Sequence, residues 1–201
     1  MAETVVKADL RRLILDTASR ILVREGYANL SMRRIAKAID YSATSIYLYF
    51  ENKEALLNQL IDDGMIWLFE RLSAADQISY SSLVAKFEAL CRAYVDFGLE
   101  HPEYYEIMFI AHPERSTRFP PELYRKARRN LYVMERTLEE GHTAGVFSVP
   151  HPRVTSSSIW AALHGTVSLL LAKRVDVSIG EKNFVDAAVQ QVLAGVMVRL
   201  K

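Results

Sequence analysis

Apolar residues recur at helical spacing along almost the whole chain, and this pattern constrains the fold more than any other feature. In the first such stretch, residues 10–22, the spacing between apolar positions alternates between three and four. Comparable apolar faces lie at residues 52–68, 83–98, 103–110, 123–138, 152–171 and 184–200. No segment shows the strict alternation of a half-buried strand. We therefore predict an all-α protein of about nine helices.

The composition is that of a folded protein with one or two domains. The chain has 201 residues, of which 50% are hydrophobic and 24% are charged. A formal net charge of +1 argues neither for nor against a nucleic-acid partner. Residues 1–50, however, hold eight Lys and Arg against five Asp and Glu. This small basic excess at the N-terminal end favours contact with phosphates, but only weakly.

Cysteine content and hydropathy predict a cytoplasmic location. Cys91 is the only cysteine, which excludes an intramolecular disulfide and any zinc site made of several cysteines. Residues 1–7 lack the basic and then apolar pattern of a signal peptide. The longest apolar run, residues 159–172, is shorter than the ~20 residues that span a bilayer. We expect this run to form a buried helix.

Residues 31–50 have the layout of two short helices joined by a turn. Ser31 and Ser42 are suited to cap the two helices, because a serine side chain accepts a hydrogen bond from the first turn. The apolar residues of this segment can pack on the first helix of the chain. This arrangement predicts a helix-turn-helix, whose second helix enters the major groove with its N-terminus first. The apolar positions are Ile35, Ala36, Ile39, Ile46 and Phe50.

The second of these helices is better suited to lie on a DNA duplex than to fill a core. Ala43, Thr44 and Ser45 at its start are small, so the backbone can approach bases and phosphates. Tyr47 and Tyr49 add two phenols, and Lys53 opens the next helix with a positive charge. The alternative interpretation of the same pattern is a solvated surface turn.

The N-terminal segment resembles the TetR family of bacterial regulators over about the first 57 residues. The resemblance rests on Ser31, Arg33, Ile35-Ala36, Ser42, the stretch from Tyr47 to Phe50, the stretch from Asn52 to Leu57, and Gly26-Tyr27. It implies that eight residues contact DNA: Ser31, Arg33, Ala43, Thr44, Ser45, Tyr47, Tyr49 and Lys53.

Two residues depart from the family pattern. Asp40 replaces the usual turn glycine, and we expect the turn to survive because Asp tolerates left-handed backbone angles better than most residues. Tyr49 replaces a frequent histidine and keeps a polar tip that can reach a phosphate.

The C-terminal part resembles the subgroup of that family with a Trp-His-Gly (WHG) type domain. Trp160, His164 and Gly165 carry this resemblance, together with the stretch from His101 to Phe109. It implies a DNA-binding domain at 1–52 and a ligand-sensing, dimerising domain at 53–201. A small, largely apolar effector could bind among aromatic and polar-tipped side chains, although each could equally be ordinary core. The candidates are Trp67, Tyr94, Phe97, Tyr104, Tyr105, Met108, Tyr132, Trp160 and His164.

The last two helices suggest a homodimer. Their apolar faces are too broad for one protomer to cover, and two copies would form a four-helix interface with twofold symmetry. Such a dimer would present two reading helices to a palindromic operator, with half-sites ~34 Å apart or a multiple of that distance. The residues expected at this interface are Val185, Ala188, Val189, Val192 and Val196.

The sequence argues against an enzyme. The five histidines show no metal-ligand spacing, and no phosphate loop, dinucleotide turn or nucleophile motif is present. We therefore expect no catalytic residue, metal or cofactor. The predicted function is transcription regulation, most simply repression, by a dimer that a ligand releases from double-stranded operator DNA. The alternative is a dimeric helical protein-binding module that no longer binds DNA.

Overall fold

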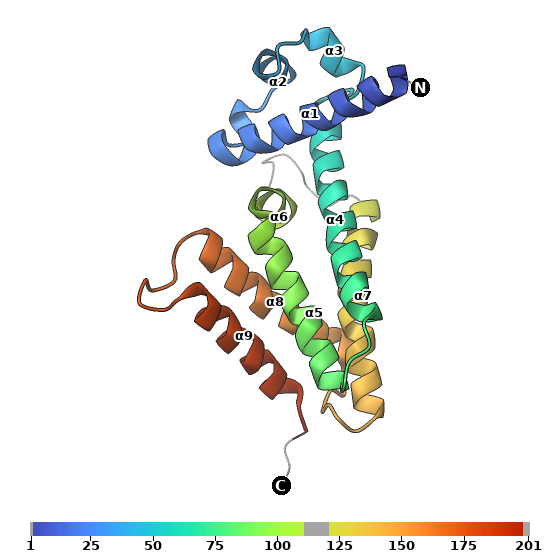
Figure 1. The fold of residues 1–201 in the computed structure, drawn as a ribbon, viewed down its shortest axis with the longest axis vertical. Helices are drawn as coiled ribbons and strands as arrows, with labels where there is room; N and C mark the ends of the chain where they lie inside the picture. Colours follow the sequence, from blue (N-terminus) through green and yellow to red (C-terminus); the bar gives the residue numbers. More distant parts are fainter. Residues whose placement is uncertain (1, 111–120, 199–201) are drawn as a thin grey trace. The chain divides into compact units, whose positions relative to one another are not determined.

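The computed structural model describes residues 2–110 and 121–198, and over these residues the protein is all-α, as predicted (Figure 1). Nine α-helices and one 3-10 turn are present in this part of the chain, and its only β pairing is an isolated bridge between Phe147 and Met197. The elements are α1 Ala2–Glu25, η1 Tyr27–Asn29, α2 Met32–Ala38, α3 Ala43–Tyr47, α4 Lys53–Gln77, α5 Leu83–Glu100, α6 Pro102–Phe109, α7 Pro121–Thr143, α8 Pro152–Leu171 and α9 Glu181–Val196.

The helices group into two compact units. The head unit comprises residues up to Gly64 together with the segment from Glu103, and the body unit comprises 65–102 and the segment from Pro121. The division falls inside α4, whereas the sequence suggested a domain boundary between residues 52 and 53. The first three turns of α4 belong to the head unit because Leu56, Leu57 and Leu60 are buried there. Most of α6 also belongs to it.

In the head unit, α1 supplies the apolar face on which the short helices pack. Ile14, Leu15 and Ala18 are buried, and α1 contacts η1 and α2, which in turn contacts α3 (Figure 1). The two short helices bury one side each, through Ile35 on α2 and Ile46 on α3. Because each helix is too short to be stable alone, this packing holds α3 in place.

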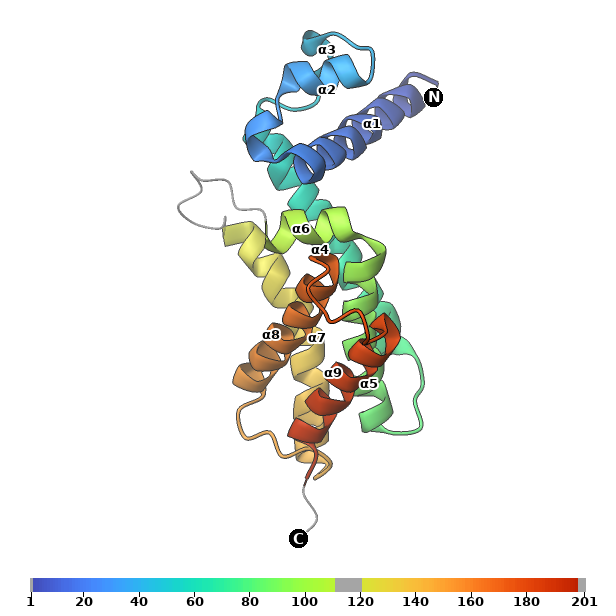
Figure 2. The same cartoon turned by 90° about the vertical axis from the view of Figure 1, so that its left-hand side faces the viewer.

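In the body unit, α5 is the central helix. It contacts α7, α8 and α9, and eight of its residues are buried. Figure 2 shows α8 and α9 lying side by side as an antiparallel pair, in agreement with their mutual contacts. The C-terminal end of α9 is tied to the segment after α7, where Ser148 N–H donates to the Val196 carbonyl over 2.7 Å.

The apolar helix α8 is less buried than expected from the sequence. By length and composition it could cross a membrane, the one helix in the described part of the chain that could, although core helices of water-soluble proteins pass the same test. Only 28% of its apolar window is buried within the protomer. Much of α8 therefore faces outward in a single chain, and the expectation of a buried helix holds for one side only.

Candidate nucleic-acid interface

Two serines cap the helices of the helix-turn-helix, as predicted. Ser31 Oγ accepts a hydrogen bond from the Arg34 amide over 3.2 Å, at the start of α2. Ser42 Oγ accepts one from the Ser45 amide over 3.1 Å, and the two hydroxyls of this pair are 2.8 Å apart. These bonds satisfy amides that would otherwise be unpaired at a helix start. Capping is thus a structural task that both serines perform without any DNA.

The turn between α2 and α3 depends on Asp40. Its φ is 58°, in the left-handed region where the family's glycine would be unstrained. The following Tyr41 amide donates to the Ala36 carbonyl over 2.9 Å and closes the turn. The expectation that Asp40 takes a left-handed conformation and preserves the turn is confirmed.

The outward face of α3 carries polar and aromatic side chains. Ile46 and Phe50 are buried, so Thr44, Tyr47 and Leu48 must point outward. Tyr47 is 53% exposed and Leu48 is 81% exposed. This face has hydroxyls for bases or phosphates and apolar groups for thymine methyls.

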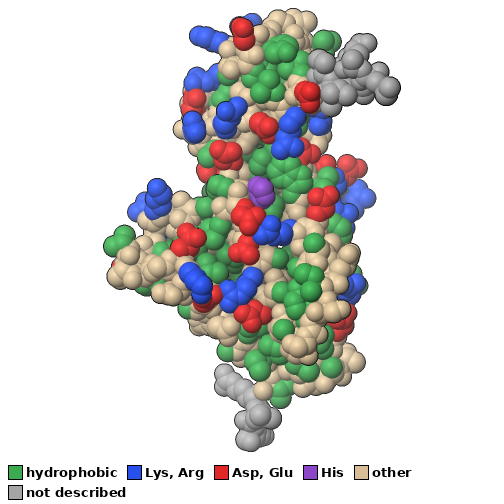
Figure 3. Space-filling view, in the orientation of Figure 1, with side chains coloured by type: hydrophobic (Ala, Val, Ile, Leu, Met, Phe, Trp, Pro, Cys, Tyr) green, Lys and Arg blue, Asp and Glu red, His purple; other side chains and the backbone are tan. Residues whose placement is uncertain are grey.

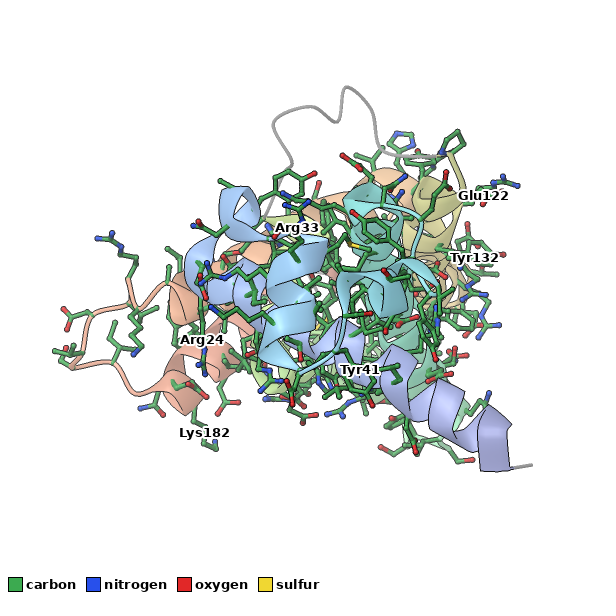
Figure 4. All side chains as sticks on the ribbon, turned by 90° about the horizontal axis from the view of Figure 1, so that it is seen from above. Arg24, Arg33, Tyr41, Glu122, Tyr132 and Lys182 are labelled. Atoms are coloured by element: carbon green, nitrogen blue, oxygen red, sulfur yellow. The ribbon has the colours of Figure 1, made fainter. Side chains whose placement is uncertain are left out.

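Tyr41 and Leu48 belong to this surface although they were absent from the predicted contacts. Tyr41 is 47% exposed and is labelled in Figure 4. The spacing from Ile46 and Phe50, both expected to be buried, already implied that Leu48 points away from the core. The position of Tyr41 depends on the turn geometry at Asp40, which the sequence pattern alone did not define.

The basic residues of α2 differ in their surroundings. Arg34 forms an ion pair with Glu25 of α1, whereas Arg33, labelled in Figure 4, is exposed. Lys37 is also exposed in the last turn of the same helix. Figure 3 shows several Lys and Arg side chains on the visible face of the head unit. The head unit therefore carries positive charge on α2, the helix that contacts α3.

Among the residues predicted to contact DNA, Lys53 has surroundings that differ most from those expected. Its ammonium donates a hydrogen bond to the Tyr27 carbonyl and lies 3.4 Å from the centre of the Tyr27 ring. Partial burial lowers the pKa of Lys53, and the nearby Glu54 carboxylate opposes this shift. In this structure Lys53 joins the start of α4 to η1.

Comparison with known proteins matches both parts of the chain to one family. Residues 14–60 match the family described as bacterial regulatory proteins, tetR family, and residues 87–194 match a tetracyclin repressor-like C-terminal domain. The second match covers more than half of the chain. This protein belongs to the TetR family.

TetR-family relatives agree with this assignment. The uncharacterized HTH-type transcriptional regulator YobS of Bacillus subtilis is 27% identical over 107 residues, which cover 53% of this chain and 55% of YobS. The chain thus spans about half the length of that relative. A protein with unknown function from Rhodococcus sp. RHA1 has a TM-score of 0.78 and 25% identity, over 94% of this chain and 96% of that one. A TetR family transcription regulator from Marinobacter aquaeolei VT8 shares the fold, with a TM-score of 0.77 at 18% identity over 99% of this chain and 100% of that one.

The residues predicted to bind a ligand are divided between the two units of this TetR-family chain. Tyr104, Tyr105 and Met108 are buried on α6, in the head unit. The other candidates are in the body unit: Trp67, Tyr94, Phe97, Tyr132, Trp160 and His164. Tyr132 is 52% exposed on α7, so its side chain faces solvent.

The aromatic residues of the body unit form two small clusters. In one, Trp160 donates its indole N–H to the Tyr94 hydroxyl over 3.0 Å, and its ring stacks on His164 with 5.4 Å between centroids. Burial lowers the pKa of His164, so its neutral form is favoured. In the other, His101 lies between Trp67 and Phe97, with centroid distances of 5.8 and 5.3 Å. The indole N–H of Trp160 and the hydroxyl of Tyr94 are thus hydrogen-bonded to each other.

The residues expected at the dimer interface lie on two different sides of α9. Val185, Val189 and Val196 are buried within the protomer, so they contact its own core. Ala188 and Val192 are only partly buried. A helix that faces both its own core and a partner is apolar on two sides. The spacing of the valines did not show which side of α9 faces the core.

Within the described residues, no group of three or more His, Cys, Asp or Glu side chains is arranged to hold a metal ion. Cys91 is fully buried on α5, and burial raises the pKa of its thiol to about 12. The thiol is therefore in its unreactive protonated form.

Proposed function

We propose that this TetR-family chain is a cytoplasmic, dimeric transcription regulator, most simply a repressor, that binds a palindromic operator and is released by a small, largely apolar ligand. The observation that carries the proposal is the outward face of α3. Its buried side is anchored by Ile46, and its other side presents Thr44 and Tyr47, while the adjoining helix α2 carries the exposed Arg33. A helix packed on one side and polar on the other is the form that enters a major groove.

Duplex binding tests this function directly. A fluorescent duplex from the DNA upstream of the protein's own coding region is titrated with the full chain at two salt concentrations. We expect Thr44→Ala combined with Tyr47→Ala to weaken binding at least tenfold, because each lost base contact typically costs about 1–3 kcal/mol. Affinity should also fall with salt, as phosphate contacts release counterions.

Tyr132→Ala is the matched control for this experiment. Tyr132 is 52% exposed and Tyr47 is 53% exposed, so the two substitutions remove similar amounts of exposed aromatic surface. Only Tyr47 lies on the proposed reading helix. Equal effects of Tyr47→Ala alone and Tyr132→Ala alone on duplex affinity would contradict the assignment of α3. Specific duplex binding absent even from the unmodified chain would favour the protein-binding alternative.

The proposed dimer uses the outward faces of α8 and α9. On α8 the exposed positions fall on one side of the helix and, apart from Arg153 in its first turn, are small or apolar: Val154, Ser157, Ser158, Ala161, Ala162 and Leu169. The corresponding side of α9 contains Phe184, Ala187, Ala188, Gln191, Ala194 and Gly195. Small side chains let helices approach closely, and two copies of this pair would form a four-helix interface. This revises the interface expected from the sequence, because three of its five residues are buried in the protomer.

Sedimentation tests the dimer. We expect Ala161→Arg to produce monomers, because an arginine in the middle of the small-residue face prevents close packing of the two helix pairs. Tyr124→Arg, at a residue 57% exposed on α7, places the same charge outside the proposed interface. It should leave the dimer intact. A dimer that persists in the Ala161→Arg variant would place the interface elsewhere.

We also propose that the body unit is of the Trp-His-Gly type and takes part in binding a small effector. The two aromatic clusters of the body unit and the two α6 tyrosines supply apolar surface with polar tips. A ligand can release the operator only if it binds the two conformations of the dimer with different affinities. A compound that raises the unfolding temperature of the protein without changing its duplex affinity would show ligand binding without this regulation.

A further inference from the structure

Gly64 lies in the middle of the 25-residue helix α4, where glycine is unfavourable. The structure shows a steric reason for it. A Cβ added at Gly64 would overlap Met108 Sδ and would lie 3.0 Å from Met108 Cγ and 3.5 Å from Tyr104 Cδ1. Met108 of α6 is 4% exposed, so its thioether is enclosed at this point. The absence of a side chain at Gly64 therefore leaves room on α4 for the Met108 side chain of α6. We call this Gly64–Met108 contact the seat.

A second residue of α6, Tyr104, is enclosed at the same place. Tyr104 is 8% exposed, and burial raises the pKa of its phenol to about 12. The Asp16 carboxylate raises the pKa further and Arg12 lowers it, and both residues are on α1. Helix α6 thus contacts α4 through Met108, and it keeps the Tyr104 side chain buried at the same place.

The chain path gives the Gly64–Met108 contact its importance. The chain passes between head and body units at three points: within α4 after Gly64, at the start of α6 after Pro102, and after residue 120. Gly64 stands at the first of these points, and Met108, which it contacts, lies on the helix that begins at the second. On the body side, the Asn130 amide donates to the Met65 carbonyl over 3.1 Å, one residue beyond the seat. Asn130 is 4% exposed, so this bond is shielded from water.

We infer that Met108 is a positioning residue for operator binding: seated on Gly64, it makes α6 and the first half of α4 move as one piece with the reading head. This assignment replaces the predicted role of Met108 as a ligand contact. It rests on the proposed function, because it is read out through DNA affinity. It adds the side chain and the glycine at which α6 is fixed to α4.

A double-mutant cycle tests the inference. Gly64→Ala, Met108→Ala and the double variant are made in the full chain, and their affinities are measured for a duplex selected from a random-sequence library by the unmodified protein. We expect Gly64→Ala to weaken binding at least tenfold, because the new methyl group displaces the thioether. Met108→Ala, which empties the seat, should also weaken binding. The double variant should bind within about threefold of Met108→Ala alone, because the added methyl no longer meets the thioether.

Gly141→Ala supplies a matched control. A Cβ at Gly141 on α7 would overlap the Phe147 ring and lie 2.8 Å from its Cγ, entirely within the body unit. It should lower the unfolding temperature and leave the duplex affinity of the folded dimer within about threefold. A merely structural role for Gly64 would make the two glycine variants alike in both measurements.

The outcomes separate the inference from the proposed function. If the unmodified protein selects no duplex, the proposed function fails. If it binds a duplex but Gly64→Ala binds equally well, the seat has no positioning role. If the losses caused by Gly64→Ala and Met108→Ala add in the double variant, stiffening of α4 and not the α6 contact is responsible. Should Gly64→Ala fail to fold, an unchanged affinity of Met108→Ala alone also overturns the inference.

Discussion

The Lys53 ammonium lies 3.4 Å from the centre of the Tyr27 ring and donates a hydrogen bond to the Tyr27 carbonyl oxygen. Lys53 is the first residue of α4, and Tyr27 opens the 3-10 turn that follows α1. This pair therefore joins the start of α4 to the end of α1. A residue expected only to contact DNA also has a structural role in the head unit.

Tyr27→Leu should destabilise the protein by about 0.5–1 kcal/mol, the usual strength of an exposed cation–π contact. The backbone carbonyl that accepts from Lys53 remains, so the loss isolates the ring. Chemical denaturation measures it. Tyr41→Leu, at a residue 47% exposed, is the control and should change stability less. In a Lys53→Met background the cost of Tyr27→Leu should largely disappear; a cost that persists would assign the effect to packing.

Asp40→Val should destabilise the head by at least about 1 kcal/mol relative to Asp40→Gly, because a β-branched residue is strained at positive φ. Asp40 has φ 58°, which glycine adopts without penalty. Thermal unfolding of the two variants compares the same site with and without a Cβ. Equal stability of the Gly and Val variants would contradict the left-handed turn.

Asp76 should make stability depend on pH in the acid range. Burial by itself would raise the pKa of Asp76, but hydrogen bonds and charge from Lys86 and Arg136 outweigh it and lower the pKa below its ordinary value. A lowered pKa in the folded state contributes stability that is complete above the unfolded pKa, about 4, and is lost as pH falls through the folded value.

Asp76→Asn should therefore cost about 1–3 kcal/mol at pH 7, because the carboxylate is 12% exposed and its loss leaves Lys86 and Arg136 with the more exposed Glu140 carboxylate. The difference from the unmodified protein should shrink below pH 4. Urea unfolding at pH 7 and at pH 3.5 measures both values. A difference that does not change with pH would exclude the charge as its cause.

Tyr94→Phe should destabilise the body unit by about 1 kcal/mol, the typical net value of one buried hydrogen bond. The substitution removes the hydroxyl that accepts from Trp160 Nε1 over 3.0 Å and keeps the ring. A shift in indole fluorescence should accompany the loss. Tyr132→Phe, at an exposed position on α7, should leave both stability and fluorescence unchanged.

Local sequence patterns predicted the secondary structure, the helix caps and the turn between α2 and α3 well. Helical periodicity identified the helices because burying one face of an amphipathic helix requires the spacing of 3.6 residues per turn. Ser31 and Ser42 were identified as caps because a helix start needs acceptors for its unpaired amides. The left-handed turn at Asp40 followed from the small set of residues that tolerate positive φ. Each of these rules involves only residues close together in the chain.

The sequence by itself thus determined the all-α class, the caps, the turn and the family, whereas tertiary structure decided what each long-range side chain contacts. Periodicity shows that α9 is apolar, but only packing shows that Val189 faces the protomer's own core and Ala187 faces outward. Periodicity placed Met108 on an apolar helix, but it did not predict the contact of Met108 with Gly64. Lys53 likewise contacts a residue 26 positions away. Contacts of this kind depend on how the helices pack together, which spacing along one helix does not encode.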